Sequence, residues 1–276
     1  RGYRLDADAG LIPSPGRTVR LGVHAFYEER EDVSYDLRDL GVSPSASYRP
    51  SPRDQITLGL LFEWIDTDDV ALGVPAGDER DFLLAAPFLT LSHDRRDSVL
   101  LPSRGYTAAI RLEAADQDVY GDISYWRASG TAAGYLPISR WLTLACSLRG
   151  GVISPFGETE EIPIALRYFA GGAGTVRGFE ERSLGPEVDG ETTGGELYLA
   201  GQAELRFRIW RDLHGAVFID AGNVWAEMRG ADLTDLRYGT GPGLRYRTPA
   251  GTIGLDVGFN PSPKDPEEEQ KSSEVL

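Results

Sequence analysis

The chain has 276 residues, a net charge of −15 and 41% hydrophobic residues. The acidic balance argues against nucleic acid as a partner, because phosphate binding needs a basic surface. The single cysteine, Cys146, excludes an internal disulfide framework and a cysteine metal cluster, and no cofactor or metal is expected. No apolar run approaches the ~20 residues of a membrane helix, but a membrane β-barrel needs only every second strand residue to be apolar.

Period-two alternation of apolar and polar residues predicts about twelve strands and no convincing amphipathic helix. In chain order, the predicted strands cover residues 2–11, 17–28, 33–48, 54–66, 81–93, 104–115, 121–136, 140–153, 195–210, 215–225, 236–247 and 250–260. The clearest is 195–210, where Leu199 and Leu205 alternate with Gln202, Glu204 and Arg206. One such strand also fits the edge of a soluble sandwich, but its repetition along the chain favours a barrel.

Many of these strands run about 10 to 12 residues, which is longer than the usual ~5–6 and close to the ~9–11 of a tilted membrane strand. The five tryptophans fall near predicted strand ends, where aromatic girdles sit in membrane barrels: Trp64, Trp126, Trp141, Trp210 and Trp225. The sequence therefore predicts an all-β fold, a transmembrane antiparallel up-and-down β-barrel.

The connections alternate between short and long, as in outer-membrane barrels with short periplasmic turns and long outer loops. The short ones lie at 13–16, 50–53, 137–139, 211–213 and 248–251, and the long ones include 66–80, 154–194 and 226–235. On this rule the polar segment 261–276 is an extracellular loop or tail, and both chain ends lie outside. We therefore expect one barrel domain over 1–276 that is incomplete, lacking an odd number of strands before it and at least one after it.

The longest connection, 154–194, contains a glycine-dense stretch followed by a cation and an aromatic side chain. Glycines permit unusual dihedral angles and close approach, so we expect this loop to fold into the barrel lumen. The candidate site residues in the stretch are Gly171, Gly172, Gly174, Val176, Arg177, Gly178 and Phe179.

A guanidinium inside a lumen requires an acidic partner, which it can bind through two hydrogen bonds. Glu204 and Asp220 lie on the charged or inward phase of nearby predicted strands. Both are candidate inner-wall partners of Arg177. The alternative is that both carboxylates simply face luminal water.

These segments together resemble the Omp85 superfamily of outer-membrane assembly and translocation barrels, and most closely its TamA branch. The resemblance is carried by residues 94–97, 101–106, 167–172, 175–179, 183–186 and 218–223. It implies a sixteen-stranded barrel whose sixth extracellular loop enters the lumen, with Arg177 bound to Asp220 and Glu204. The twelve strands would be the fourth to fifteenth, so the chain lacks the family's periplasmic POTRA modules and the lateral gate between first and last strands. We expect the sheet to stay open, without pairing between 2–11 and 250–260.

The resemblance implies a barrel that folds or exports client proteins in the outer membrane of a Gram-negative bacterium. Its expected partners are membrane lipid, client outer-membrane or autotransporter proteins, and an inner-membrane or periplasmic protein reached through POTRA modules. A two-partner secretion transporter is the main alternative, and a passive porin is less favoured. A barrel hydrolase would need a Ser–His or Asp–His group, but His24, His93 and His214 lie in no such motif, so no enzyme activity is expected.

Overall fold

The computed structural model describes residues 2–11, 19–31, 35–68, 70, 81–248 and 251–261. The predicted turn at 13–16, most of the connection at 66–80 and all but the first residue of the tail at 261–276 lie outside the described residues. Within the described part, no helix is long and apolar enough to cross a membrane.

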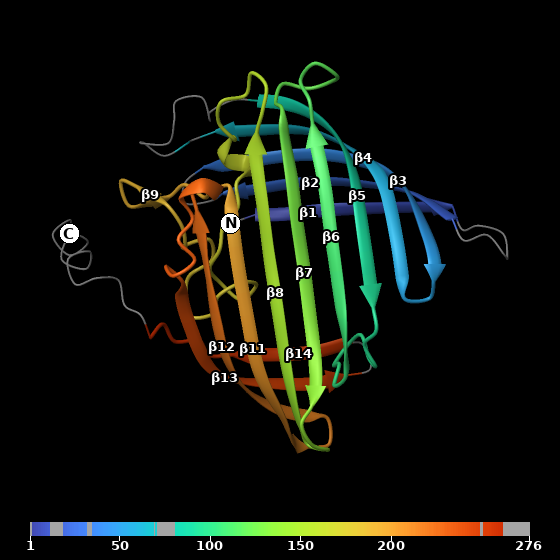
Figure 1. Ribbon diagram of the computed structural model, residues 1–276, viewed down its shortest axis with the longest axis vertical. Coiled ribbons are helices and arrows are strands. Elements are labelled where there is room, and N and C mark those ends of the chain that lie inside the picture. Colours follow the sequence, from blue (N-terminus) through green and yellow to red (C-terminus); the bar gives the residue numbers. More distant parts are fainter. Residues whose placement is uncertain are drawn as a thin grey trace.

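Twelve long strands form one antiparallel sheet, and each is hydrogen-bonded to its neighbours along the chain (Figure 1). They are β1 (Gly2–Leu11), β2 (Val19–Glu31), β3 (Asp36–Ser51), β4 (Asp54–Asp68), β5 (Asp81–Asp94), β6 (Gly105–Ala115), β7 (Tyr125–Pro137), β8 (Leu142–Pro155), β11 (Leu197–Trp210), β12 (Leu213–Trp225), β13 (Arg237–Thr248) and β14 (Gly251–Asp256). The connection between β8 and β11 holds a 3₁₀ turn, η1 (Ile164–Leu166), and a small hairpin of β9 (Glu187–Val188) and β10 (Glu191–Thr192). A second 3₁₀ turn, η2 (Met228–Gly230), follows β12. The predicted all-β, up-and-down architecture is confirmed.

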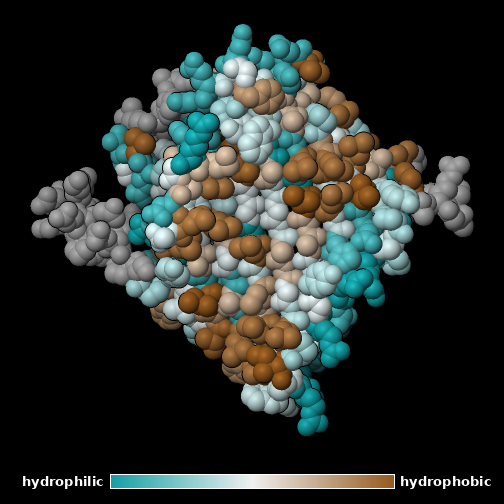
Figure 2. All heavy atoms as spheres, viewed as in Figure 1, coloured by the Kyte–Doolittle hydropathy of each residue, from teal (hydrophilic) through white to brown (hydrophobic). Residues whose placement is uncertain are grey.

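Side chains alternate across this sheet, as the period-two pattern requires. On β12, for example, Val217 and Ile219 are exposed on the outer face, whereas Phe218 and Asp220 are buried on the inner face. Figure 2 shows apolar side chains gathered in patches over the outer face of the strands in this view. An exposed apolar surface of this extent is expected for a wall that faces lipid.

The inner face carries an apolar cluster as well as charges, which the simple division into an apolar outer and a charged inner face did not predict. Leu61, Ile65, Phe82 and Leu84 point inward from β4 and β5 and are buried. They pack with apolar residues of the β8–β11 connection, including Ile164. Part of the interior is therefore a packed core and not a water-filled lumen.

The sheet is open, as predicted: β1 and β14 are its two edges and do not pair with each other among the described residues. The sheet curls so that β14 reaches the connection between β5 and β6, where the Thr252 hydroxyl donates a hydrogen bond to the Leu100 carbonyl oxygen at 3.0 Å.

Two predicted strands are at least three residues shorter than the sequence pattern indicated. The strand predicted at 121–136 begins at Tyr125, and Gly121 instead forms an isolated bridge with Leu84 of β5. The strand predicted at 250–260 is regular only to Asp256, after which Phe259 pairs with Thr240. The interruption lies where the loop tip touches the wall, since a Cβ on Gly258 would be 2.5 Å from the Gly178 nitrogen.

The tryptophans agree with a girdle at only some positions. Trp126, Trp141 and Trp210 are exposed on the surface and Trp64 is half-buried, but Trp225 is only 7% exposed. Its indole nitrogen donates a hydrogen bond to the Asp232 carbonyl oxygen at 3.1 Å. Trp225 therefore anchors the β12–β13 connection, and its assignment to a lipid-facing girdle was wrong.

Candidate functional site

The long connection between β8 and β11 lies against the inner face of the sheet. Ile162, Ile164 and Leu166 are buried in the apolar cluster formed with strands β2–β8. Arg127 of β7 also donates a hydrogen bond from Nη2 to the Leu166 carbonyl oxygen at 2.8 Å. The first half of the loop is thus fixed inside the curve of the sheet.

The glycine-dense stretch forms a compact turn that returns on itself. Gly171 and Gly172 have φ angles of +109° and +81°, which glycine adopts without strain. The Thr175 hydroxyl donates to the Gly171 carbonyl oxygen and accepts from its nitrogen, both at 2.8 Å. Gln202 of β11 then holds the turn by donating to the Thr175 carbonyl oxygen at 3.0 Å. Gly174 has no such steric demand, since a Cβ there would meet nothing within 4 Å.

Arg177 points from this turn into the inner wall and binds Asp220 of β12. Its Nε and Nη2 donate to the two carboxylate oxygens at 2.7 Å each, and its backbone nitrogen donates to Oδ2 at 3.0 Å. Arg177 is 7% exposed and Asp220 is fully buried. A bidentate pair of this kind is the strong form of a charge-assisted hydrogen bond.

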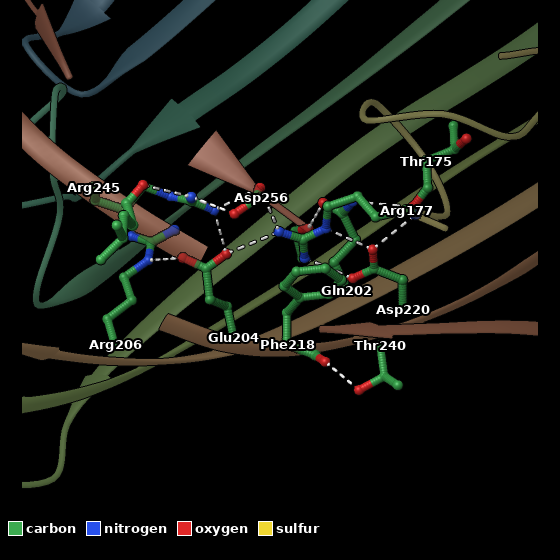
Figure 3. A network of polar contacts seen from close by, with 12 residues as sticks. Thr175, Arg177, Gln202, Glu204, Arg206, Phe218, Asp220, Thr240, Arg245 and Asp256 are labelled. Atoms are coloured by element: carbon green, nitrogen blue, oxygen red, sulfur yellow. Dashed lines mark hydrogen bonds and ion pairs between the residues drawn. The ribbon is translucent and has the colours of Figure 1, made fainter. Parts of the chain in front are cut away.

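The guanidinium also reaches two further carboxylates, Glu204 of β11 and Asp256 of β14. Its Nη1 donates to Glu204 at 3.1 Å and to Asp256 at 3.0 Å. Its Cζ lies 3.4 Å from the ring centroid of Phe218, which adds a cation–π contact. Figure 3 shows these groups converging on one guanidinium.

Two other arginines complete the network. Arg245 of β13 donates to Glu204 at 2.8 Å and to Asp256 at 2.5 and 3.0 Å, and Arg206 donates to Glu204 at 2.7 Å. We call Arg177, Arg206, Arg245, Glu204, Asp220 and Asp256 the ion cluster. Its three positive and three negative charges balance, which is what makes buried charge tolerable.

The electrostatic state of Arg177 follows from this balance. Burial acts to lower the pKa of Arg177, but the hydrogen bonds and attraction of Asp220, with the hydrogen bonds of Glu204 and Asp256, outweigh it and raise the pKa. Arg177 is therefore a permanent cation that fixes the loop.

The loop tip lies so close to the wall that side chains are excluded at the contact. A Cβ on Gly239 of β13 would be 1.8 Å from the Arg177 carbonyl oxygen, and one on Gly178 would be 2.8 Å from the Phe259 backbone. Next to this contact, Val176 is fully buried with Leu184 and Val224 in a small apolar cluster, against which Phe179 packs. The structure thus brings Val176, Arg177, Gly178 and Phe179 to the inner wall together.

A second arginine attaches the loop to the other side of the sheet. Arg182 donates from Nη2 to the hydroxyl of Tyr35 at 2.7 Å, and its Cζ lies 3.5 Å from the ring centroid of Phe169. Tyr35 precedes β3 and is 1% exposed. The loop therefore bridges the first strands of the sheet and the last ones.

Several of these residues were not predicted from the sequence. Asp256 could have been found, because it lies on the inward phase of its strand, as Glu204 and Asp220 do. Arg182 and Gly239 carry no comparable signal, since their roles depend on which strands face the loop.

In the part of the chain that the structure describes, none of the three histidine rings is hydrogen-bonded to a serine. His24 and His93 bind Asp8 and Asp54 at 2.9 and 2.5 Å, and His214 lies 3.4 Å from the Asp212 carbonyl oxygen. Ser51 donates a hydrogen bond to Asp54 at 2.5 Å, so this serine is bonded to a carboxylate and not to an imidazole. Over the described residues, no group of three or more His, Cys, Asp or Glu side chains is placed to hold a metal ion.

Comparison with known proteins gives relatives in bacteria and in animals. The chain is 29% identical over 210 residues to the outer membrane protein assembly factor BamA of Neisseria meningitidis serogroup B, covering 64% of this chain and 26% of that protein. It is 34% identical over 186 residues to the sorting and assembly machinery component 50 homolog A of Xenopus laevis, covering 61% and 36%. The chain thus spans between a quarter and two fifths of these relatives.

Two solved structures share the fold. BamA from Haemophilus ducreyi, lacking POTRA domains 1–3, aligns with 96% of this chain and 59% of its own at a TM-score of 0.80 and 18% identity. CdiB from Acinetobacter baumannii aligns with 96% and 48% at a TM-score of 0.59 and 14% identity. Residues 12–273 match the Omp85 superfamily domain. Because that match covers nearly the whole chain, the protein belongs to the Omp85 superfamily.

Proposed function

We propose that this chain is the barrel part of an outer-membrane assembly factor that folds and inserts client β-barrel proteins. The support is membership of the Omp85 superfamily together with relatives named as assembly factors in bacteria and animals. The observation that carries the proposal is the buried attachment of Arg177 to Asp220, Glu204 and Asp256. A passive pore would account for the strands but not for the glycine-dense loop that carries Arg177.

In this proposal the loop stiffens one wall while the sheet edges recruit clients. The ion cluster joins the loop to β11, β12, β13 and β14, so these strands and the loop move as one body. An exposed strand edge elsewhere in the complete protein offers unpaired backbone groups, which template an incoming client strand by β-augmentation. Because the loop and strands β11–β14 are rigid, the barrel wall opens only on the side away from them.

The proposal is tested by client assembly in reconstituted vesicles. The full-length protein and its Arg177→Ala and Arg177→Lys variants are inserted into vesicles, and conversion of an unfolded client barrel to its heat-modifiable folded form is followed on gels. We expect Arg177→Ala to abolish most client assembly, and Arg177→Lys to retain an intermediate level because a lysine supplies charge without the bidentate fork. The exposed Arg229→Ala is the matched control, with unchanged assembly.

The folded state of each variant is checked by its own heat-modifiable mobility, so that loss of activity is separated from loss of the barrel. Normal client assembly by a folded Arg177→Ala protein would refute the role proposed for the loop. Failure of the unmodified protein to assemble any barrel client would refute the function itself.

A two-partner secretion transporter is the alternative, and the likeness in fold to CdiB favours it over a porin. It predicts export of a soluble partner across the vesicle membrane without insertion of client barrels. The same vesicles distinguish the two functions by whether the client ends protected in the lumen or integrated in the bilayer.

We place the protein in the outer membrane of a Gram-negative bacterium, within the TamA branch, with autotransporter-type clients and a periplasmic or inner-membrane partner bound through POTRA modules. The support for this placement is the resemblance of residues 167–172 and 183–186 to that branch. Relatives in animals match the chain as well, so fractionation of the native cell membranes is the direct measurement of location.

A further inference from the structure

Charge is divided between the two ends of the sheet, although the chain as a whole is strongly acidic. The connections at the end that holds the β8–β11 loop carry many exposed carboxylates: Asp118, Asp122, Glu158, Glu160, Glu161, Glu180, Glu181, Glu187, Asp189, Glu227, Asp232 and Asp235. The connections at the opposite end, which are the short turns and the β5–β6 connection, carry five exposed arginines, which we call the arginine rim: Arg53, Arg95, Arg104, Arg140 and Arg211.

Among the described residues the charge of the arginine rim is largely unpaired, although Arg95 attracts the Asp54 carboxylate. Within the described part of the chain, none of its five members forms an ion pair. The carboxylates at this end are already bound elsewhere: Asp54 pairs with His93, Asp94 with Arg96 and Asp212 with Arg247. Asp97 accepts hydrogen bonds from Ser103 and from the backbone of Arg104. The rim guanidiniums are therefore available to an external anion.

Large apolar and aromatic side chains adjoin the same turns. Trp141 and Trp210 are 59% and 66% exposed and are the chain neighbours of Arg140 and Arg211. The Cζ of Arg211 lies 4.9 Å from the Trp210 ring centroid. In Figure 2 one apolar patch lies close to this lower end of the molecule, where the short turn between β7 and β8 is drawn in Figure 1.

This combination is that of a membrane interface and not of a protein-binding face. Exposed tryptophans on the outer surface lie at the headgroup level of a bilayer, which places the adjacent guanidiniums among lipid phosphates. Arginine binds phosphate oxygens through two parallel hydrogen bonds, and basic side chains near a membrane surface attract anionic lipids.

We propose that the arginine rim binds the phosphate headgroups of anionic phospholipid in the leaflet that contacts the short turns, the inner leaflet of the outer membrane. Arg140 with Trp141 and Arg211 with Trp210 are its principal contacts, and they set the depth and tilt of this wall. The inference rests on the membrane residence included in the proposed function but not on client assembly.

The test uses the full-length protein in vesicles of phosphatidylcholine containing a minority of phosphatidylglycerol. Two samples of identical composition differ only in whether the phosphatidylglycerol or an equal amount of phosphatidylcholine is brominated, and bromine quenches nearby tryptophan fluorescence. We expect brominated phosphatidylglycerol to quench at least about twofold more strongly, because each rim arginine attracts anionic lipid. The quenching ratio is the quenching by brominated phosphatidylglycerol divided by that by brominated phosphatidylcholine. In the Arg140→Gln/Arg211→Gln variant this ratio should be close to one.

Two controls make the result specific. Arg229→Gln removes an exposed arginine from the acidic end and should leave the ratio unchanged, while Arg140→Lys/Arg211→Lys should preserve part of it. Heat-modifiable mobility shows that each variant is inserted, so failure of lipid selectivity is distinguishable from failure of insertion or of client assembly.

A ratio of one in the inserted, unmodified protein overturns the proposal, as does a ratio that the double glutamine variant leaves intact. Loss of the ratio on adding inorganic phosphate would also overturn it, because it would indicate a site for free phosphate. Binding of an acidic periplasmic protein to the rim, abolished by the same double variant while the lipid ratio is one, would assign the surface to a protein partner instead.

Discussion

The carboxylates of the ion cluster differ in burial and in the number of hydrogen bonds that they accept from Arg177. Asp220 is fully buried and accepts three hydrogen bonds from Arg177, whereas the Asp256 side chain is 25% exposed and divides its oxygens between Arg177 and Arg245. Because an unpaired charge is most costly where water is excluded, the two carboxylates should differ sharply in importance.

We expect Asp220→Asn to reduce the free energy of unfolding by about 3 to 5 kcal/mol and Asp256→Asn by about 1 kcal/mol. The asparagine at 220 keeps the shape but leaves Arg177 short of a buried negative charge. The measurement is the urea midpoint of the heat-modifiable barrel band. Equal losses of unfolding free energy from the two variants would show that the burial of a carboxylate does not determine how much it contributes to stability.

A pH-sensitive contact lies in the connection between β5 and β6. Asp97 accepts hydrogen bonds from the Ser103 nitrogen and hydroxyl at 2.9 and 2.6 Å and from the Arg104 nitrogen at 3.1 Å. Partial burial acts to raise the pKa of Asp97, but these hydrogen bonds outweigh it and lower the pKa.

A carboxyl group whose pKa is lowered on folding contributes stability that is present above its unfolded pKa of about 3.9. That contribution is lost as the pH falls through the lower, folded value. We therefore expect the amide protection of Ser103 and Arg104 to fall as the pH drops below about 4, measured by hydrogen exchange in detergent micelles. Asp97→Asn should remove this pH dependence, and its persistence in that variant would assign it to another group.

Among the elements, the β8–β11 loop is distinctive because it is attached at both sides of the sheet. Arg177 binds β11, β12 and β14, and Arg182 binds Tyr35 near the start of β3 and stacks on Phe169. The loop therefore acts as a crosspiece between strands that are distant in the sheet.

We expect Arg182→Ala to release only the second attachment. Loss of the hydrogen bond to Tyr35 and of the cation–π contact should destabilise the loop by about 1 to 3 kcal/mol without removing the barrel. Limited proteolysis should then cut within residues 178–194 faster than in the unmodified protein, while Arg229→Ala serves as the unaffected control. Unchanged cleavage rates would show that the contacts of Arg182 do not hold the loop.

The elements could be predicted from the sequence more fully than the contacts between them. The alternation in 195–210 placed Glu204 and Arg206 on the inner face because a strand's period is independent of its surroundings. The same reasoning could not find Gly239 or Tyr35, whose roles depend on how far the sheet curls. Nor could it show that inward-facing Leu61 and Ile65 pack against the loop, because period alone does not distinguish a dry interior from a wet one.

At the scale of the whole molecule, the outer surface is the feature most easily tested. Leu148 of β8 is exposed on the outer face in the middle of its strand, whereas Thr131 of β7 lines the interior cavity that also contains Arg177. An arginine on the lipid face near the middle of a bilayer costs about 2 to 4 kcal/mol.

We accordingly expect Leu148→Arg to lower the stability of the inserted barrel by about 2 to 4 kcal/mol and to slow its insertion into vesicles. Thr131→Arg, which adds the same side chain on the inner face, should have a much smaller effect. Heat-modifiable mobility after urea-dilution refolding measures both the stability of the inserted barrel and its rate of insertion. Equal tolerance of the two substitutions would mean that the outer face is not embedded in lipid.

The attachment of Arg177 also constrains the order in which the molecule can be built. Its carboxylate partners come 27, 43 and 79 residues later in the chain, so the loop is synthesised before the wall that receives it exists. The guanidinium can be neutralised in this way only once β11, β12 and β14 have formed the wall around it. Neutralisation of that one cation thus reports that the final strands have taken their correct register, which makes the loop an internal checkpoint on the protein's own assembly.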